Sequence, residues 1–204
     1  MRPVRRREAQ ADKRRRILEA AVQAFGASGY YRTRISDIAK AADVADGTVY
    51  LYFESKEEIL STLFDDLMSR FLSLGRAAIA EVDGAPARLR RLIELHLHNL
   101  GSNRDLATVF QIELRHSSRF MEMYSRSHLR EYFQLVADVL EEGRADGSIR
   151  ADLDPWFATK CIFGIVDEAA TNWVLSEKNY RLASVVDRIM DFVERGVAAG
   201  AGKK

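Results

Sequence analysis

Between residues 34 and 56 the chain carries side chains suited to contacting nucleic acid. The candidates are Arg34, Ser36, Asp46, Gly47, Thr48, Tyr50, Tyr52 and Lys56. Gly47 permits close backbone approach, Thr48 can bond a base or a phosphate, and the tyrosine hydroxyls can reach phosphate oxygens. Lys56 would add a charged phosphate contact. Asp46 either accepts from cytosine or caps a helix, and both interpretations stay open.

Two very short helices joined by a tight turn must position these side chains. The first helix has one apolar face at helical spacing, formed by Ile35, Ile38, Ala39 and Ala42. The turn follows at residues 42–44, where Asp43 tolerates the left-handed conformation. The second helix begins near Ala45 or Asp46 and buries Val44, Val49 and Phe53. This pattern predicts a helix-turn-helix; in the alternative, the tyrosines are ordinary surface residues of a small helical domain.

The distribution of charge agrees with DNA binding at one end. Residues 1–56 hold 12 Lys/Arg and 7 Asp/Glu, whereas residues 57–204 hold 19 and 23. We therefore predict a DNA-binding domain over residues 1–56 and an acidic body over residues 57–204. The basic run at residues 2–16 is either a solubilising tail or an arm that contacts phosphates or the minor groove.

The remaining periodicity predicts an all-α protein of nine helices without a sheet. A helix from about Ala11 to Ala27 covers the back of the reading pair. A long helix begins near Ser55 with a capping box, ends by about Val82, and connects the two domains as a lever. Further helices are predicted at Pro86 to Leu100, Asp105 to Arg115, Ser118 to Glu142, Pro155 to Leu175 and Arg181 to Val197.

Several functional classes find no support in the sequence. No apolar run could span a membrane and no signal peptide is evident, so a cytoplasmic protein is expected. Cys161 stands alone, which excludes an internal disulfide, and we predict that it is buried. His96 and His98 diverge on a helix, so no metal site is predicted. Neither a phosphate loop nor a nucleophile elbow is present, and Asp167-Glu168 lack a catalytic partner, so we expect no enzyme. A helical lipid carrier with no DNA-binding role would not account for the basic N-terminal segment.

The N-terminal motifs resemble the DNA-binding domain of the TetR family. The matching residues are Gly29-Tyr30, Thr33, Ile38-Ala39, Val44, Gly47-Thr48, Tyr50-Leu51-Tyr52-Phe53 and Lys56. Arg34, Asp43 and Asp46 depart from the family pattern. The resemblance implies that residues 57–204 form a ligand-binding and dimerisation domain. It also implies a homodimer formed through the last two helices and a palindromic operator in double-stranded DNA. The apolar residues expected in this interface are Phe157, Val166, Ala170, Trp173, Val186, Ile189 and Val193.

A second resemblance, covering nearly the whole chain, is to the fatty-acid-degradation regulators of the TetR family. The matching segments are 44–48, 110–117, 162–168, 171–174 and 178–180. This resemblance implies a repressor of β-oxidation genes that long-chain acyl-CoA releases from DNA, with no cofactor besides this effector. The alternative is a TetR-type repressor that responds to another hydrophobic molecule, such as a drug or toxic lipid, and controls efflux.

An acyl-CoA would need an apolar lining and a basic mouth. The expected ligand-binding residues are Leu67, Phe71, His96, Leu100, Phe110, Arg115, His116, Tyr124 and Phe163. Basic residues gather nearby in the sequence, at Arg104, Arg115, His116, Arg119, Arg126 and Arg130. They either hold the phosphates of the effector or pair with Glu113, Glu122 and Glu131 on solvated faces.

Overall fold

The computed structural model describes the backbone of residues 2–113 and 128–199, and the side chains of residues 8–112 and 128–199. Within these ranges the chain forms nine α-helices and no strand, which confirms the predicted all-α class. The helices are α1 (Arg2–Ser28), α2 (Ile35–Ala41), α3 (Asp46–Tyr50), α4 (Lys56–Ala80), α5 (Ala85–Gly101), α6 (Arg104–Thr108), α8 (His128–Asp146), α9 (Pro155–Leu175) and α10 (Val186–Val197). In the same ranges, no helix is long and apolar enough to cross a membrane.

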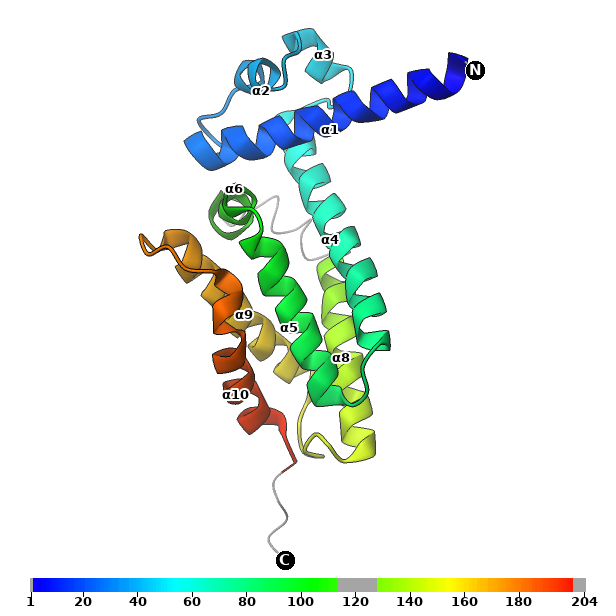
Figure 1. Ribbon diagram of the computed structural model, residues 1–204, viewed down its shortest axis with the longest axis vertical. Helices are drawn as coiled ribbons and strands as arrows, with labels where there is room; N and C mark the ends of the chain where they lie inside the picture. Colours follow the sequence, from blue (N-terminus) through cyan, green and yellow to red (C-terminus); the bar gives the residue numbers. More distant parts are fainter. Residues whose placement is uncertain (1, 114–127, 200–204) are drawn as a thin grey trace, which may run out of the picture.

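Helices α1, α2 and α3 form a head that lies across one end of the molecule (Figure 1). Its core contains the fully buried side chains of Ile17, Phe25, Ile38 and Val49. The turn between α2 and α3 forms as predicted, because Asp43 adopts a left-handed φ of 53°. The head therefore presents α3 on its outer side while α1 supports it from behind.

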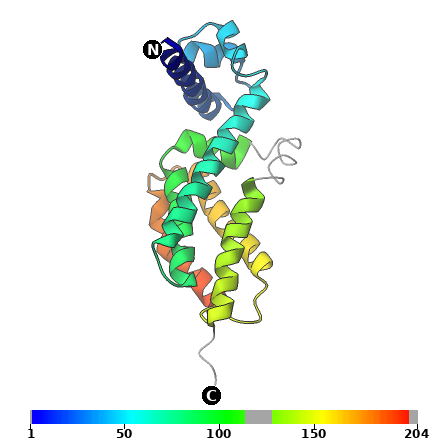
Figure 2. The same ribbon diagram turned by 90° about the vertical axis from the view of Figure 1, so that its right-hand side faces the viewer.

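Helix α4 runs from the head along the body, so it belongs to both parts (Figures 1 and 2). Its N-cap is Ser55, whose Oγ accepts a hydrogen bond of 3.1 Å from the backbone N–H of Glu58. The Glu58 carboxylate reaches back to the backbone N–H of Glu54, at 2.5 Å. The capping signal in the sequence was therefore correct, and α4 ends within two residues of the predicted Val82.

Helices α4, α5, α8, α9 and α10 form the body, a bundle around a second apolar core. Two of its elements differ from the prediction. The helix expected from Asp105 to Arg115 is instead the short α6 followed by a π-helix, η1, over Val109–Glu113. The helix expected from Arg181 begins as a 3-10 helix, η3, over Leu182–Val185. The predicted start of the next long helix at Ser118 lies outside the described residues.

The two cores meet along α4. The core of the head continues past residue 56 to Leu63 and Phe64, and it also takes in Val109 and Phe110 of η1. Met68 packs against both cores. The first 56 residues therefore contain the reading helices, whereas the packing that supports them reaches one to two turns further along α4.

A second junction joins the head to the body at Gly26, near the end of α1. A Cβ atom at this position would lie 2.6 Å from Cβ of Asp105 on α6, closer than such atoms approach. The glycine thus permits α1 and α6 to pack backbone against side chain. Movement of α6 is therefore coupled directly to the helix that supports the head.

Candidate DNA-binding head and effector pocket

The predicted DNA-contacting residues lie on the outer face of the head. Arg34, Ser36, Asp46, Gly47 and Tyr50 are exposed, and Thr48 and Tyr52 are half-buried. Tyr50 exposes 56% of its surface, although its neighbours Val49 and Phe53 are buried in the core. The short helix α3 therefore separates a buried face from an exposed face that carries hydroxyl and aromatic groups. This arrangement suits a helix that enters the major groove.

Asp46 and Gly47 are the first two residues of α3 and lie at the start of this exposed face. A Cβ atom at Gly47 would meet nothing within 4 Å, so the packing of the protein itself does not require a glycine here. The small residue instead leaves room for a partner to approach the backbone. The N-cap of α3 is Ala45, and the Asp46 side chain makes no hydrogen bond to other described residues. The interpretation of Asp46 as a helix cap therefore fails, because it lies one residue inside the helix.

Lys56 has an internal role that the sequence did not indicate. Its Nζ donates hydrogen bonds to the carbonyl oxygens of Tyr30 at 2.7 Å and Thr33 at 2.9 Å. The carbonyl oxygen of Tyr31 lies 3.5 Å away, and the ammonium sits 4.4 Å from the centre of the Tyr30 ring. Lys56 thus fixes the loop between α1 and α2 to the start of α4. These bonds hold its ammonium within the head, and the predicted phosphate contact of Lys56 stays a prediction.

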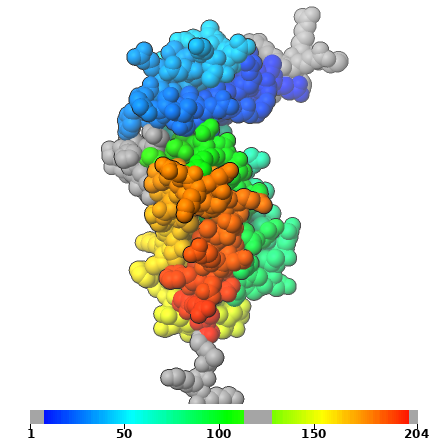
Figure 3. Space-filling model, turned by 60° about the vertical axis from the view of Figure 1, so that its left-hand side comes forward, coloured from blue at the N-terminus to red at the C-terminus, as the bar shows by residue number. Residues whose placement is uncertain are grey.

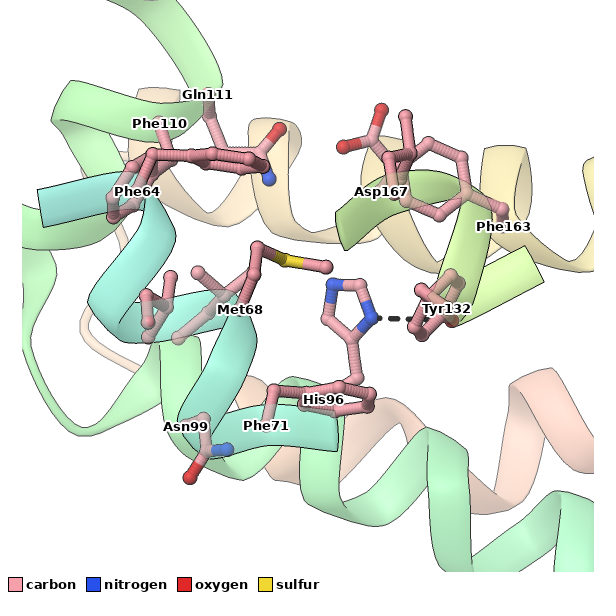
Figure 4. Close-up of a pocket in the computed structure, with 13 residues that line it drawn as sticks. Phe64, Met68, Phe71, His96, Asn99, Phe110, Gln111, Tyr132, Phe163 and Asp167 are labelled. Atoms are coloured by element: carbon pink, nitrogen blue, oxygen red, sulfur yellow. Dashed lines mark hydrogen bonds between the residues drawn. The ribbon is translucent and has the colours of Figure 1, made fainter. Parts of the chain in front are cut away.

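A small apolar cavity of about 50 Å³ lies in the body between α4, α5, η1, α8 and α9. Six of the predicted ligand-binding residues line it: Leu67, Phe71, His96, Leu100, Phe110 and Phe163. Figure 4 shows the side chains of Phe71, Phe110 and Phe163 around the space that His96 enters. The apolar wall and its few polar groups are typical of a site for a hydrophobic small molecule.

The other expected ligand contacts cannot be placed against this wall from the described residues. Arg115, His116 and Tyr124 lie outside the described residues, as do Arg119 and Arg126. Arg104 instead binds the end of α9, where its Nη2 donates to the carbonyl oxygens of Trp173, Val174 and Ser176 at 3.0, 3.1 and 2.6 Å. Its guanidinium also lies over the Trp173 ring. Arg104 therefore joins α6 to α9, a structural role that neither interpretation from the sequence had included.

Sequence reasoning missed several residues of the wall: Met68, Asn99, Gln111, Leu129, Tyr132 and Asp167. Leu129 and Tyr132 are three residues apart and share one face of α8, a signal that the sequence did contain. Gln111 is buried and accepts a hydrogen bond of 2.9 Å from the hydroxyl of Thr171. Asp167 faces the pocket, whereas Glu168 bonds the Asn172 side chain at 2.8 Å. Asp167 and Glu168 therefore lie in different surroundings.

His96 is the central polar group of this pocket. Its side chain is half-buried and lines the cavity. Its Nδ1 lies 3.4 Å from the hydroxyl of Tyr132. Burial lowers the pKa of His96 to about 4, against a smaller opposing effect of the Asp167 carboxylate. The imidazole is therefore neutral at pH 7. His98 lies on the exposed side of α5, so the predicted divergence of the two histidines is confirmed.

The depressed pKa of His96 predicts a pH dependence of stability. The unfolded chain binds a proton at this histidine below about pH 6.5, whereas the folded protein resists protonation down to about pH 4. Stability contributed by the neutral ring is complete above pH 6.5 and declines as pH falls towards 4. Urea denaturation at pH 7 and at pH 4 gives the unfolding free energy of each protein. We expect the decrease between these pH values to be about 3 kcal/mol smaller in His96→Phe than in the wild type. Parallel pH profiles of the two proteins would contradict this assignment.

The pocket shares part of its wall with the core of the head. Phe64 of α4 and Phe110 of η1 line the cavity and also belong to the core of the head. Their rings pack edge to face, with centres 5.9 Å apart. A molecule that fills the cavity therefore contacts the same two rings that support the head. This contact gives the pocket a direct physical route to α3.

The expected dimer interface requires a correction. Of the seven residues predicted to form it, Val166, Ala170, Trp173, Val186, Ile189 and Val193 are buried in the core of the protomer itself. Phe157 alone among them is exposed, at 67%. Helix α9 is apolar nearly all round, so its pattern indicated two covered faces without showing which face packs inward.

Exposed apolar side chains remain on α9 and α10, which are coloured yellow to orange and orange to red in Figure 3. Phe157 and Phe192 expose 67% and 68% of their surfaces. They line a groove with Ile165 and Cys161. Cys161 is exposed, so its predicted burial within the protomer was wrong. A surface with exposed phenylalanines of this kind is typical of a protein interface.

Comparisons with known proteins agree with both sites. Residues 17–63 match the family described as bacterial regulatory proteins, tetR family, and residues 64–196 match the YsiA-like C-terminal region. The chain is 35% identical to the fatty acid metabolism regulator protein of Bacillus subtilis, over 89% of this chain and 93% of that protein. It is 27% identical to the transcriptional repressor KstR2 of Rhodococcus jostii, over 92% of each protein.

Two solved structures resemble the whole fold. The fatty acid degradation regulator FadR of Bacillus halodurans superposes with a TM-score of 0.86 at 37% identity, covering 90% of this chain and 95% of that one. FadR of B. subtilis in complex with stearoyl-CoA superposes with a TM-score of 0.83 at 35% identity, covering 89% and 97%. The similarity therefore extends over the head and the pocket together.

Proposed function

Because this chain belongs to the TetR family of bacterial regulatory proteins, we propose that it is a transcriptional repressor of fatty-acid degradation genes that long-chain acyl-CoA releases from DNA. The observation that carries this proposal is the apolar cavity of the body, in a chain similar over most of its length to a regulator whose structure was solved in complex with stearoyl-CoA. The protein acts as a regulator in the cytoplasm and not as an enzyme.

The head reads the operator through α3 and the start of α2. Gly47 lets the backbone approach the groove, and Thr48 with the hydroxyls of Tyr50 and Tyr52 supplies hydrogen bonds to bases and phosphates. Arg34 and Ser36 contact phosphates at the start of α2. Lys56 keeps the loop between α1 and α2 in place and so positions these groups.

The effector acts through the shared wall of the pocket. An acyl chain in the cavity displaces Phe64 and Phe110, and α4 transmits this displacement to the head because it runs through both cores. The contact between α6 and α1 at Gly26 adds a second path. Release requires that acyl-CoA bind the conformation with displaced heads more tightly than the operator-bound conformation.

The repressor works as a homodimer through the exposed surface of α9 and α10. A two-fold axis at this surface pairs Phe157 and Phe192 with their counterparts in a second copy, and Gly164 and Gly196 leave open space for close approach. Two heads related in this way read half-sites about 34 to 36 Å apart, so the operator is palindromic.

The proposal is tested on an operator selected from a random duplex library with the purified protein. Fluorescence anisotropy then follows the complex as stearoyl-CoA, stearate or CoA is added. We expect stearoyl-CoA alone to release the operator, since it combines the acyl chain with the nucleotide head. Release by an unrelated apolar drug but not by any acyl-CoA would replace this proposal with the alternative of an efflux regulator.

A further inference from the structure

We propose that His96, positioned by Tyr132, holds the thioester carbonyl oxygen of the bound acyl group. This inference rests on the proposed function, because it assigns one atom of the acyl-CoA to one group of the pocket. It makes His96 a specificity-determining residue: the pocket then distinguishes an acyl thioester from other molecules that carry the same alkyl chain.

Aromatic rings surround the imidazole, and one of its two ring nitrogens has no hydrogen-bond partner among the described residues. The ring centres of Phe71, Tyr132 and Phe163 lie 5.7, 5.7 and 6.2 Å from that of His96. Nδ1 faces the Tyr132 hydroxyl, whereas Nε2 has no hydrogen-bond partner among the described residues. Figure 4 shows this second nitrogen directed into the cavity, towards Met68. Because this nitrogen is open to the cavity, a ligand there can form a hydrogen bond with it.

Tyr132 determines what kind of partner fits. When its hydroxyl donates to Nδ1, the single proton of the neutral imidazole resides on Nε2. The cavity then contains a neutral N–H donor surrounded by apolar groups. Such a donor suits a neutral carbonyl oxygen, because no charge must leave water to reach it.

The chemistry of acyl-CoA offers one acceptor at the right place. Its alkyl chain has no acceptor, and its phosphates are too strongly hydrated to enter an apolar wall. The thioester carbonyl is neutral and lies where the alkyl chain begins. A free fatty acid would instead bring a carboxylate near Asp167, which also lines the pocket and carries the same charge. The subsite therefore favours the thioester over the free acid.

A pair of ligands isolates this hydrogen bond. Stearoyl-CoA and S-octadecyl-CoA have the same chain and the same nucleotide, but the thioether has a methylene group in place of the carbonyl. Dissociation constants are measured by calorimetry on the full-length protein. We expect the wild type to bind the thioether about three- to tenfold more weakly, the effect of one hydrogen bond between neutral groups.

The ratio of the two constants is then compared between variants. His96→Phe keeps an aromatic ring but removes the donor, so the ratio should fall to within about twofold of one. Tyr132→Phe removes the hydroxyl that fixes the tautomer and should also lower the ratio. Leu100→Val is the matched control, because it changes the apolar wall and should weaken both ligands by the same factor. An equal affinity of the wild type for the two ligands, or an unchanged ratio in His96→Phe, overturns the subsite. Failure of the wild type to bind either ligand instead overturns the proposed effector itself.

Discussion

Replacing Phe157 and Phe192 together with aspartate is expected to convert the dimer to a monomer and to weaken operator binding by at least about 100-fold. Both rings expose about two thirds of their surface in the protomer, so the substitution should leave the fold intact. In the proposed dimer they are expected to be buried, and aspartates placed there would be buried without partners. A monomer engages one half-site and loses the gain from simultaneous binding of two heads.

Light scattering gives the mass of the variant, and anisotropy gives its affinity for the selected operator. Leu74→Asp serves as the matched control, since this leucine is 43% exposed on α4, on the other side of the body from α10 (Figure 1). The control should remain dimeric and keep its operator affinity. A dimeric double variant, or a monomer with undiminished affinity, would rule out this surface as the interface on which DNA binding depends.

Lys56→Ala is expected to weaken operator binding by at least about tenfold through loss of order in the head. The ammonium donates to the carbonyl oxygens of Tyr30 and Thr33, which lose these partners in the variant. We expect a loss of about 2 kcal/mol in unfolding free energy, in line with hydrogen bonds from a charged donor. Because the pocket lies further along α4, the affinity for stearoyl-CoA should stay unchanged.

The salt dependence of operator binding decides between an internal role and a phosphate contact for Lys56. An internal lysine leaves the slope of log K against log salt unchanged, whereas a lost phosphate contact reduces it by about one. Lys178→Ala, an exposed lysine in the loop after α9, is the control for removal of a positive charge. Undiminished stability together with a reduced slope would restore the phosphate contact that the sequence predicted.

The positions of α2, α3, α4, α5 and α9 were predictable because they depend on local periodicity and caps, whereas α1 begins at Arg2 and not near Ala11. The two faces of α3 follow from the spacing of Val49 and Phe53, and the start of α4 follows from Ser55. The role of Lys56 was not predictable, since its carbonyl partners lie more than 20 residues away and meet it only after packing. The same holds for the pairing of His96 with Tyr132, which depends on how α5 and α8 pack in the bundle.

The π-helix η1 is a segment whose structure differs from what its local sequence predicts. The sequence around Phe110 reads as an ordinary helix, yet residues 109–113 adopt the wider turn. Val109 and Phe110 consequently pack into the core of the head, while Gln111 bonds Thr171 on α9. Short π-helical segments are often found at functional sites. Here the segment connects the pocket wall to the reading head.

The most direct test of repression released by acyl-CoA is the reciprocity of the two binding events. The dissociation constant of stearoyl-CoA is measured on the free protein and again with saturating operator. We expect the operator to weaken stearoyl-CoA binding by the same factor by which stearoyl-CoA weakens operator binding, because both ligands act on one conformational equilibrium. Identical constants for stearoyl-CoA with and without operator would show that the pocket and the head are not coupled.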